Sequence, residues 1–229
     1  DEDIVFTSST PSDSVRQMFY YWTGEWCNDR QDYEDAKRYA LEALPLYNGN
    51  SDAKADCLNL LGVVFVRLGD FASGVTYTKQ CLDVELKSGD NDRIASSFST
   101  LAGTYIAAED PAAALKYSLQ GLKYADKARN SLRKTILMGM ASEAYYKKGE
   151  YEKAVKYADE AYRIDSIDDR QNRAAIRLSQ KATALVGLGK YAEAETTFLK
   201  AFPILIESNN YHSLAIDYNH CLLYTSPSP

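Results

Sequence analysis

The chain has 229 residues, of which 45% are hydrophobic and 25% charged, a composition that supports a packed core and argues against disorder. Its formal net charge of −6 provides no source for the phosphate contacts on which nucleic-acid binding depends. No run approaches the roughly 20 apolar residues that a membrane-spanning helix needs, so we expect no membrane span in this region. The chain begins at Asp1, which we interpret as a processed mature chain or a fragment.

Residues 1–13 are rich in Ser, Thr and Asp and lack helical periodicity, which predicts a loose lead-in with an N-cap at Ser12 or Asp13. From Ser14 onward, apolar residues recur every three or four positions, which predicts a first helix. A second helix is expected from Tyr33 to Tyr47, and the sequence Asn48-Gly49-Asn50 is typical of a helix end.

The same alternation of two amphipathic helices and a short turn continues through most of the chain. Asp110 and Pro111 illustrate its start signals, because an N-cap is followed by a proline at the first helical position. A sixth first helix is expected to begin near Tyr211 and is not completed. The other expected helix pairs are Asp52 to Leu68 with Phe71 to Lys87, Asp92 to Ala108 with Pro111 to Arg129, Ser131 to Lys148 with Tyr151 to Asp165, and Asp168 to Leu188 with Tyr191 to Glu207.

A small residue five positions after each turn sets the register of the pairs. These residues are Ala36, Gly74, Ala114, Ala154 and Ala194, and they lie 38 residues apart at first and 40 residues apart thereafter. A fixed period of this size is typical of a helical solenoid, in which each pair closes one apolar face and leaves another for the next pair. The sequence therefore predicts an all-α fold, an α-solenoid of five antiparallel helix pairs and an incomplete sixth over residues 14–220.

Five pairs in phase resemble the tetratricopeptide repeat family. The resemblance is best in Leu58-x-x-Leu61-Gly62-x-x-Phe65-x-x-x-Gly69-x-Phe71 and in Tyr145-x-x-x-Gly149-x-Tyr151-x-x-Ala154. Gln31 stands in place of the turn glycine in pair one, and Ser142 replaces a small residue of the family pattern in pair four. The period of about 40 also exceeds the 34 residues of the common repeat. The resemblance implies a right-handed superhelix.

The longer repeat is similar to the sensor regions of bacterial (Bacteroidetes-like) signalling and transcriptional regulators. In those proteins an extracytoplasmic solenoid precedes a membrane helix and a DNA-binding or kinase output. The resemblance therefore implies a periplasmic or extracytoplasmic part of a membrane-anchored regulator, with a cytoplasmic protein as the alternative.

Catalysis, cofactors and metal binding are not expected. His212 and His220 lie eight residues apart on one helix, too far to share a metal ion without other ligands. The sequence has no nucleophile elbow, phosphate-binding glycine loop or zinc-protease motif. Three of the four cysteines fall at core positions of the repeats, which favours buried free thiols over disulfides or a zinc site. The four are Cys27, Cys57, Cys81 and Cys221.

The first helix of each pair lines the concave groove in tetratricopeptide proteins, so the resemblance implies ligand contacts there. The carboxylate clamp of co-chaperones needs Lys and Asn at matched positions, and it is absent because Ser99 and Gly139 follow Asn59. The mixed groove is consistent with an extended peptide or a partner helix. The candidate groove residues are Tyr21, Glu25, Asn59, Val63, Arg67, Ser99, Gly103, Glu143, Tyr146, Lys147, Ser179 and Thr183.

Two functions are compatible with this fold. The chain is a protein- or peptide-binding sensor region of a larger regulator, or it is a passive scaffold that binds partners through its convex face or a terminal edge. Residues 221–229 end in Thr-Ser-Pro-Ser-Pro, which we interpret as read-through of a sequencing adaptor or, alternatively, as a natural flexible terminus. The sequence specifies neither the ligand nor the oligomeric state.

Overall fold

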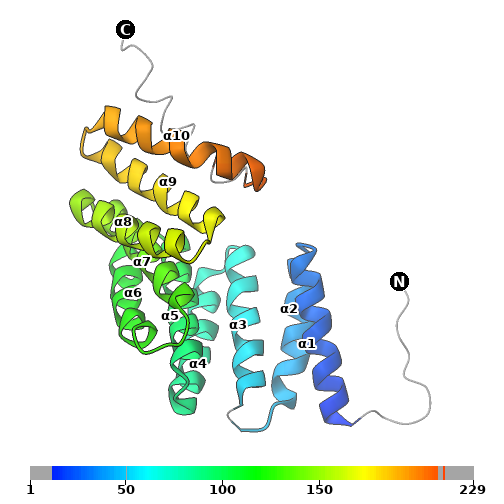
Figure 1. Ribbon diagram of the computed structural model, residues 1–229. Coiled ribbons are helices and arrows are strands. Elements are labelled where there is room, and N and C mark those ends of the chain that lie inside the picture. The colour runs from blue at the N-terminus through cyan, green and yellow to red at the C-terminus, as the bar shows by residue number, and fades with distance from the viewer. Residues whose placement is uncertain (1–11, 50, 211–213, 215–229) are drawn as a thin grey trace.

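The computed structural model describes residues 12–49, 51–210 and 214 (Figure 1). The described residues form ten α-helices and one short 3₁₀ helix, η1 (Leu44–Leu46), and contain no strand. The first helices of the five pairs are α1 (Asp13–Asp29), α3 (Asp52–Arg67), α5 (Asn91–Ala107), α7 (Ser131–Lys147) and α9 (Gln171–Gly187). The second helices are α2 (Tyr33–Ala43), α4 (Phe71–Ser88), α6 (Pro111–Ala125), α8 (Tyr151–Ile167) and α10 (Tyr191–Glu207).

The pairs stack one upon the next along a curved path, which confirms the predicted α-solenoid (Figure 1). Each first helix contacts the first helix of the following pair, from α1 through to α9. Within the described residues, no two second helices bring their backbones as close together. The first helices therefore lie on the inner side of the curve, and the second helices lie on the outer side.

Left-handed backbone residues recur about every 20 positions and mark the turns. Within the pairs they are Gln31, Gly69, Glu109, Gly149 and Gly189, and between the pairs they are Gly49, Gly89, Asp169 and Asn209. Gln31 and Glu109 adopt φ values of 65° and 57°, a conformation that costs a non-glycine residue roughly 1–2 kcal/mol. Packing of the helix pairs thus imposes the turn even where glycine is missing.

Close packing between helices explains the small residues that set the register. Ala36, Ala114 and Ala154 are fully buried, and Ala194 is nearly so. At the second position, a Cβ added to Gly74 would lie 3.2 Å from the carbonyl oxygen of Gly62. Only a small residue fits where two helix backbones approach this closely.

Two second helices are shorter than the sequence predicts. α2 ends at Ala43 rather than Tyr47, because Pro45 turns the chain into η1. α6 ends at Ala125 rather than Arg129, and the backbone N–H of Lys127 donates to the Tyr124 carbonyl at 2.9 Å in a tightened last turn.

Helices α8 and α9 also differ from the prediction at their shared boundary. α8 continues to Ile167 instead of ending at Asp165, and α9 begins at Gln171 instead of Asp168. The N–H of Arg170 donates to the Asp165 carbonyl at 2.8 Å, which closes the end of α8 with left-handed Asp169.

The N-terminal helix begins at Asp13 with Ser12 as its N-cap residue, but the Ser12 side chain makes no capping hydrogen bond. The cysteines Cys27, Cys57 and Cys81 are buried and free, as the sequence predicts. The lead-in before residue 12, the expected helix start near Tyr211, His212, His220, Cys221 and the tail 221–229 lie outside the described residues.

Candidate functional site

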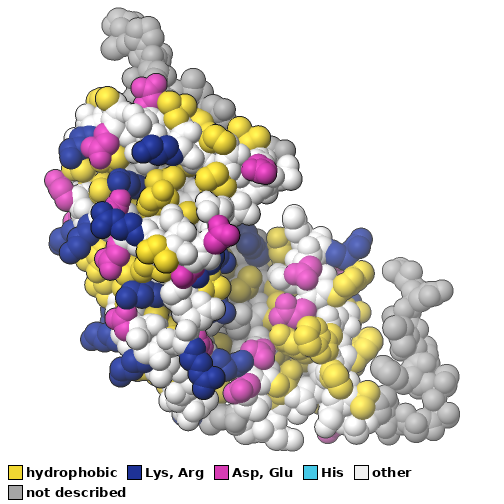
Figure 2. Space-filling view, in the orientation of Figure 1, with side chains coloured by type: hydrophobic (Ala, Val, Ile, Leu, Met, Phe, Trp, Pro, Cys, Tyr) yellow, Lys and Arg dark blue, Asp and Glu magenta, His cyan; other side chains and the backbone are white. Residues whose placement is uncertain are grey.

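A pocket of about 330 Å³ opens across the N-terminal ends of three successive first helices. Asp56 and Asn59 reach it from α3, Arg93 from α5, and Arg133 from α7. Because α3, α5 and α7 lie on the inner side of the solenoid, the pocket belongs to the concave face. Figure 2 shows the molecular surface hollowed between the N-terminal and C-terminal parts of the solenoid.

Arg93 forms one wall of the pocket and joins three helices. Its Nε donates to both carboxylate oxygens of Glu85 in α4, at 2.9 and 3.0 Å, and its Nη2 donates to Asp56 Oδ1 in α3 at 2.8 Å. Glu85 is only 2% exposed, and its hydrogen bonds are the main reason that the pKa of Arg93 is raised. Arg93 is therefore engaged in holding the wall of the pocket.

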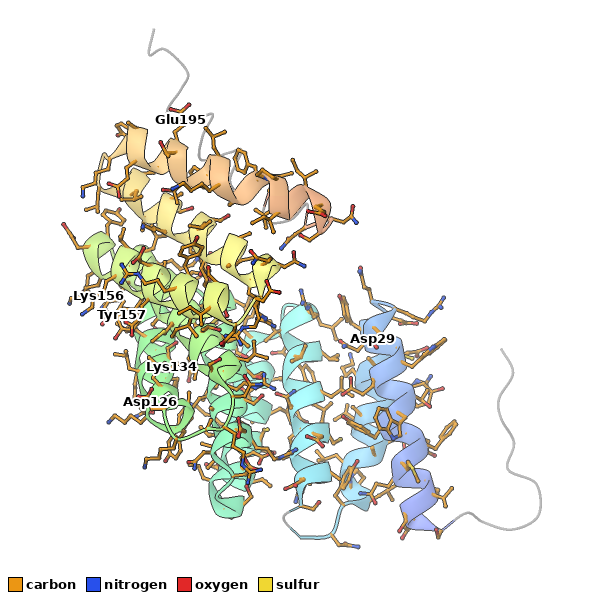
Figure 3. All side chains as sticks on the ribbon, in the orientation of Figure 1. Asp29, Asp126, Lys134, Lys156, Tyr157 and Glu195 are labelled. Atoms are coloured by element: carbon orange, nitrogen blue, oxygen red, sulfur yellow. The ribbon has the colours of Figure 1, made fainter. Side chains whose placement is uncertain are left out.

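Two of the predicted groove residues form a pair on α1. The Tyr21 hydroxyl donates to Glu25 Oε1 at 2.9 Å, and both side chains are half-buried. Burial raises the pKa of the Glu25 carboxyl, and the nearby charges of Asp29, which is labelled in Figure 3, and Asp56 raise it further. Burial also raises the pKa of Tyr21.

The predicted residues on α7 lie on the C-terminal half of the inner face. Glu143 is half-buried, and burial raises its pKa while the charges of Lys147 and Arg177 oppose the shift. The Tyr146 ring lies 5.6 Å from the Tyr151 ring, between centroids, and Lys147 is exposed.

A second buried ionic cluster, which sequence reasoning did not identify, lies behind Glu143. Asp165 is fully buried and accepts a hydrogen bond from Arg170 Nε at 2.7 Å, while Arg177 Nε lies 3.5 Å from its other oxygen. Arg177 is 6% exposed, and burial lowers its pKa to about 10. Its guanidinium lies directly over Gly139, where an added Cβ would collide with Nη1.

The remaining candidates are spread along the inner face. Asn59 lines the pocket, Val63, Gly103 and Thr183 are half-buried, and Arg67 is exposed. Ser99 and Ser179 are 7% and 5% exposed and present little surface, and Ser99 Oγ donates to the Ser96 carbonyl at 2.7 Å. The structure thus brings only Asn59 to the pocket, and the binding role of all twelve residues stays a prediction.

Arg133 is a pocket residue that the sequence did not single out. It stands at the repeat position of Arg93, 40 residues further along the chain, so the register that located Asn59 could have located it. Within the described residues, neither a metal-binding group of three or more His, Cys, Asp or Glu residues nor a helix long and apolar enough to cross a membrane is found.

The chain is similar to known proteins in its repeat sequence and in its fold. Residues 137–168 match the tetratricopeptide repeat family, whereas a search of curated proteins finds no match. Aspartyl phosphate phosphatase F from Bacillus subtilis is similar in structure, with a TM-score of 0.81, 14% identity, and coverage of 94% of this chain and 57% of that one.

Two further solved structures share the fold. The Rap conjugation gene regulator of the plasmid pLS20, in complex with a peptide, gives a TM-score of 0.74 at 16% identity, covering 100% of this chain and 65% of that one. A signal transduction ATPase with a tetratricopeptide repeat sensor, from Pyrococcus horikoshii, gives a TM-score of 0.75 at 19% identity. The match covers 88% of this chain and 31% of that one. The chain therefore spans less than two thirds of each of these three proteins. It contains a tetratricopeptide repeat at residues 137–168 and has the fold of tetratricopeptide-like repeat proteins.

Proposed function

We propose that the chain binds an extended protein or peptide segment along its inner face, as the interaction region of a larger regulator. The pocket across α3, α5 and α7 carries this proposal. Two of its polar side chains, Asn59 and Arg133, make no hydrogen bond or ion pair with any other described residue. An asparagine side chain can donate to and accept from a peptide backbone, and a free guanidinium can donate two hydrogen bonds to a carboxylate of the ligand.

The structural neighbours support the two parts of the proposal separately. One Rap regulator was solved with a peptide bound, which supports a peptide as the ligand. The signal transduction ATPase uses its tetratricopeptide repeats as a sensor, which supports a place within a larger signalling protein. For this chain we propose binding without catalysis, on the extracytoplasmic side of a membrane-anchored regulator or, alternatively, in the cytoplasm.

Selection from a phage-displayed library of random peptides tests the binding function. A selected peptide, labelled with a fluorophore, is titrated against the wild type and against Asn59→Ala and Arg133→Ala. We expect each substitution to weaken binding at least tenfold, about 1.4 kcal/mol, because each removes a polar group that faces the peptide.

Lys123→Ala provides the matched control, because Lys123 is an exposed cation on α6, on the outer side of the solenoid. The affinity of the Lys123→Ala variant for the peptide should equal that of the wild type. Binding that is unchanged in both pocket variants, or a library that yields no binder, would contradict the proposed function.

A further inference from the structure

The outward face of α1 carries a continuous stripe of exposed apolar side chains. Val15, Met18, Trp22 and Trp26 follow one another at helical spacing and are 48%, 57%, 62% and 60% exposed. Figure 2 shows hydrophobic side chains gathered over the part of the surface that α1 occupies in Figure 1. Two exposed tryptophans on one helix face are unusual on a surface without a partner.

The repeat register identifies this stripe as a stacking face. Trp22 and Trp26 hold the positions that Leu60 and Val64 hold in α3, 38 residues later. Leu60 and Val64 are 2% and 0% exposed, because this face of α3 packs on the preceding pair, where Leu60 lies against Gly24. The α1 stripe is thus the same interface, and no described element covers it.

We propose that a second copy of this chain covers the stripe, with the two α1 helices packed antiparallel about a two-fold axis at Trp22. In this register Trp22 meets Trp22 of the other copy, and Met18 meets its Trp26, so the stripe is self-complementary. Arg30 lies beside the stripe, with its Cζ 4.9 Å from the Trp26 ring centroid.

At the opposite end of the solenoid, part of the surface that a head-to-tail contact would use is already covered. The surface of pair five that would receive a stacking face is formed by Leu178, Ala201 and Leu205, and Leu214 already packs against these three residues. The stripe itself is therefore the surface that a second copy presents.

The area of the stripe predicts a weak dimer. Its four side chains offer roughly 500 Å² of apolar surface per copy. A symmetric contact would then bury about 1,000 Å² in total, which is near the lower limit for a specific interface. We expect dissociation in the micromolar range of protein concentration.

Sedimentation velocity of the 229-residue chain over a range of about 1 to 200 µM tests the proposal. The expected result is a monomer–dimer equilibrium in which Trp22→Ala and Trp26→Ala each raise the dissociation constant at least tenfold. Leu199→Ala, which removes a side chain 61% exposed on α10, should leave the constant unchanged. A monomer at every concentration, or a dimer that both tryptophan variants leave intact, would overturn the proposal.

Discussion

Gly139 shows how a residue can be misread when its neighbours across the repeat are unknown. In the sequence it breaks a possible carboxylate clamp, since it follows Asn59 and Ser99 in the repeat register. In the structure it leaves room for the Arg177 guanidinium, which is held by Gln180 Oε1 at 2.9 Å and by the charge of Asp165. The glycine on α7 therefore makes room for a buried ion pair between α8 and α9.

We expect Gly139→Ala to destabilise the protein by roughly 2 kcal/mol, because the new methyl group displaces a buried guanidinium from its carboxylate. The free energy of unfolding in urea measures the effect. Gly103→Ala is the matched control, since its Cβ would meet only the flexible end of Met140, whose Cε lies at 3.7 Å. Alanine is the better helix former, so this control should be neutral or stabilising by about 0.5 to 1 kcal/mol. Equal effects of the two substitutions would contradict the assigned role of Gly139.

Helix starts could be predicted from the sequence more accurately than helix ends. All five second helices begin where expected, at Tyr33, Phe71, Pro111, Tyr151 and Tyr191, because local cap and register signals define these positions. The ends of α2, α6 and α8 differ, because a proline and the hydrogen bonds of the following turn decide where each helix stops. Those bonds depend on how the next pair packs, which a single helix does not reveal.

Helix α10 contains a proline in its interior, Pro203. The missing N–H leaves the carbonyl of Leu199 without its helical hydrogen bond. Both residues lie on the exposed side of the helix, so water can reach the carbonyl. This exposure explains how the helix continues through Pro203.

We expect Pro203→Ala to raise the melting temperature and to stabilise the protein by about 1 kcal/mol or more, because it restores a helical hydrogen bond. Calorimetry of the variant checks this. Pro111→Ala makes the same chemical change at the first position of α6, where no N–H is needed, and it should shift stability by less than about 0.5 kcal/mol. Destabilisation by Pro203→Ala would show that the proline fits α10 better than alanine does.

The junctions between pairs are not equivalent across the whole molecule. Glu85 and Asp165 occupy the same repeat position, 80 residues apart, and each is a buried carboxylate bound by arginine of the following pair. Between them, at the junction of pairs three and four, the same position holds Ala125. That junction carries instead a partly exposed ion pair between Asp126 and Lys134, at 2.8 Å (Figure 3).

Arg93→Ala should destabilise the protein by about 3 kcal/mol, because Glu85 would remain buried without its partner. Lys134→Ala removes the more exposed pair and should cost less than about 1 kcal/mol. Urea unfolding of both variants gives the comparison. A loss as small for Arg93→Ala as for Lys134→Ala would show that the buried cluster adds nothing to the junction.

The site could be predicted only in part, and for one reason. The repeat register predicted an inner-face position for Asn59 because each face of a helix recurs every three or four residues, and Asn59 lines the pocket. The sequence did not reveal that Arg93 and Glu85 form a buried pair at the pocket, because a charged residue on an amphipathic helix is ordinarily expected to face solvent. Their partners come from other pairs, such as Asp56, which lies 37 residues before Arg93. Such contacts become visible only when the pairs are stacked.

The alanine at position 125 also bears on how a chain of this kind can grow. Evolution lengthens repeat proteins by duplicating whole units, and a new unit must match the surfaces on both sides of the insertion. At the junctions marked by Glu85 and Asp165, an inserted unit would separate a buried acid from its arginine. At Ala125 it would separate only apolar surfaces and solvent-accessible charges. The middle junction is therefore the place where this solenoid could acquire or lose a 40-residue unit at the least cost in stability.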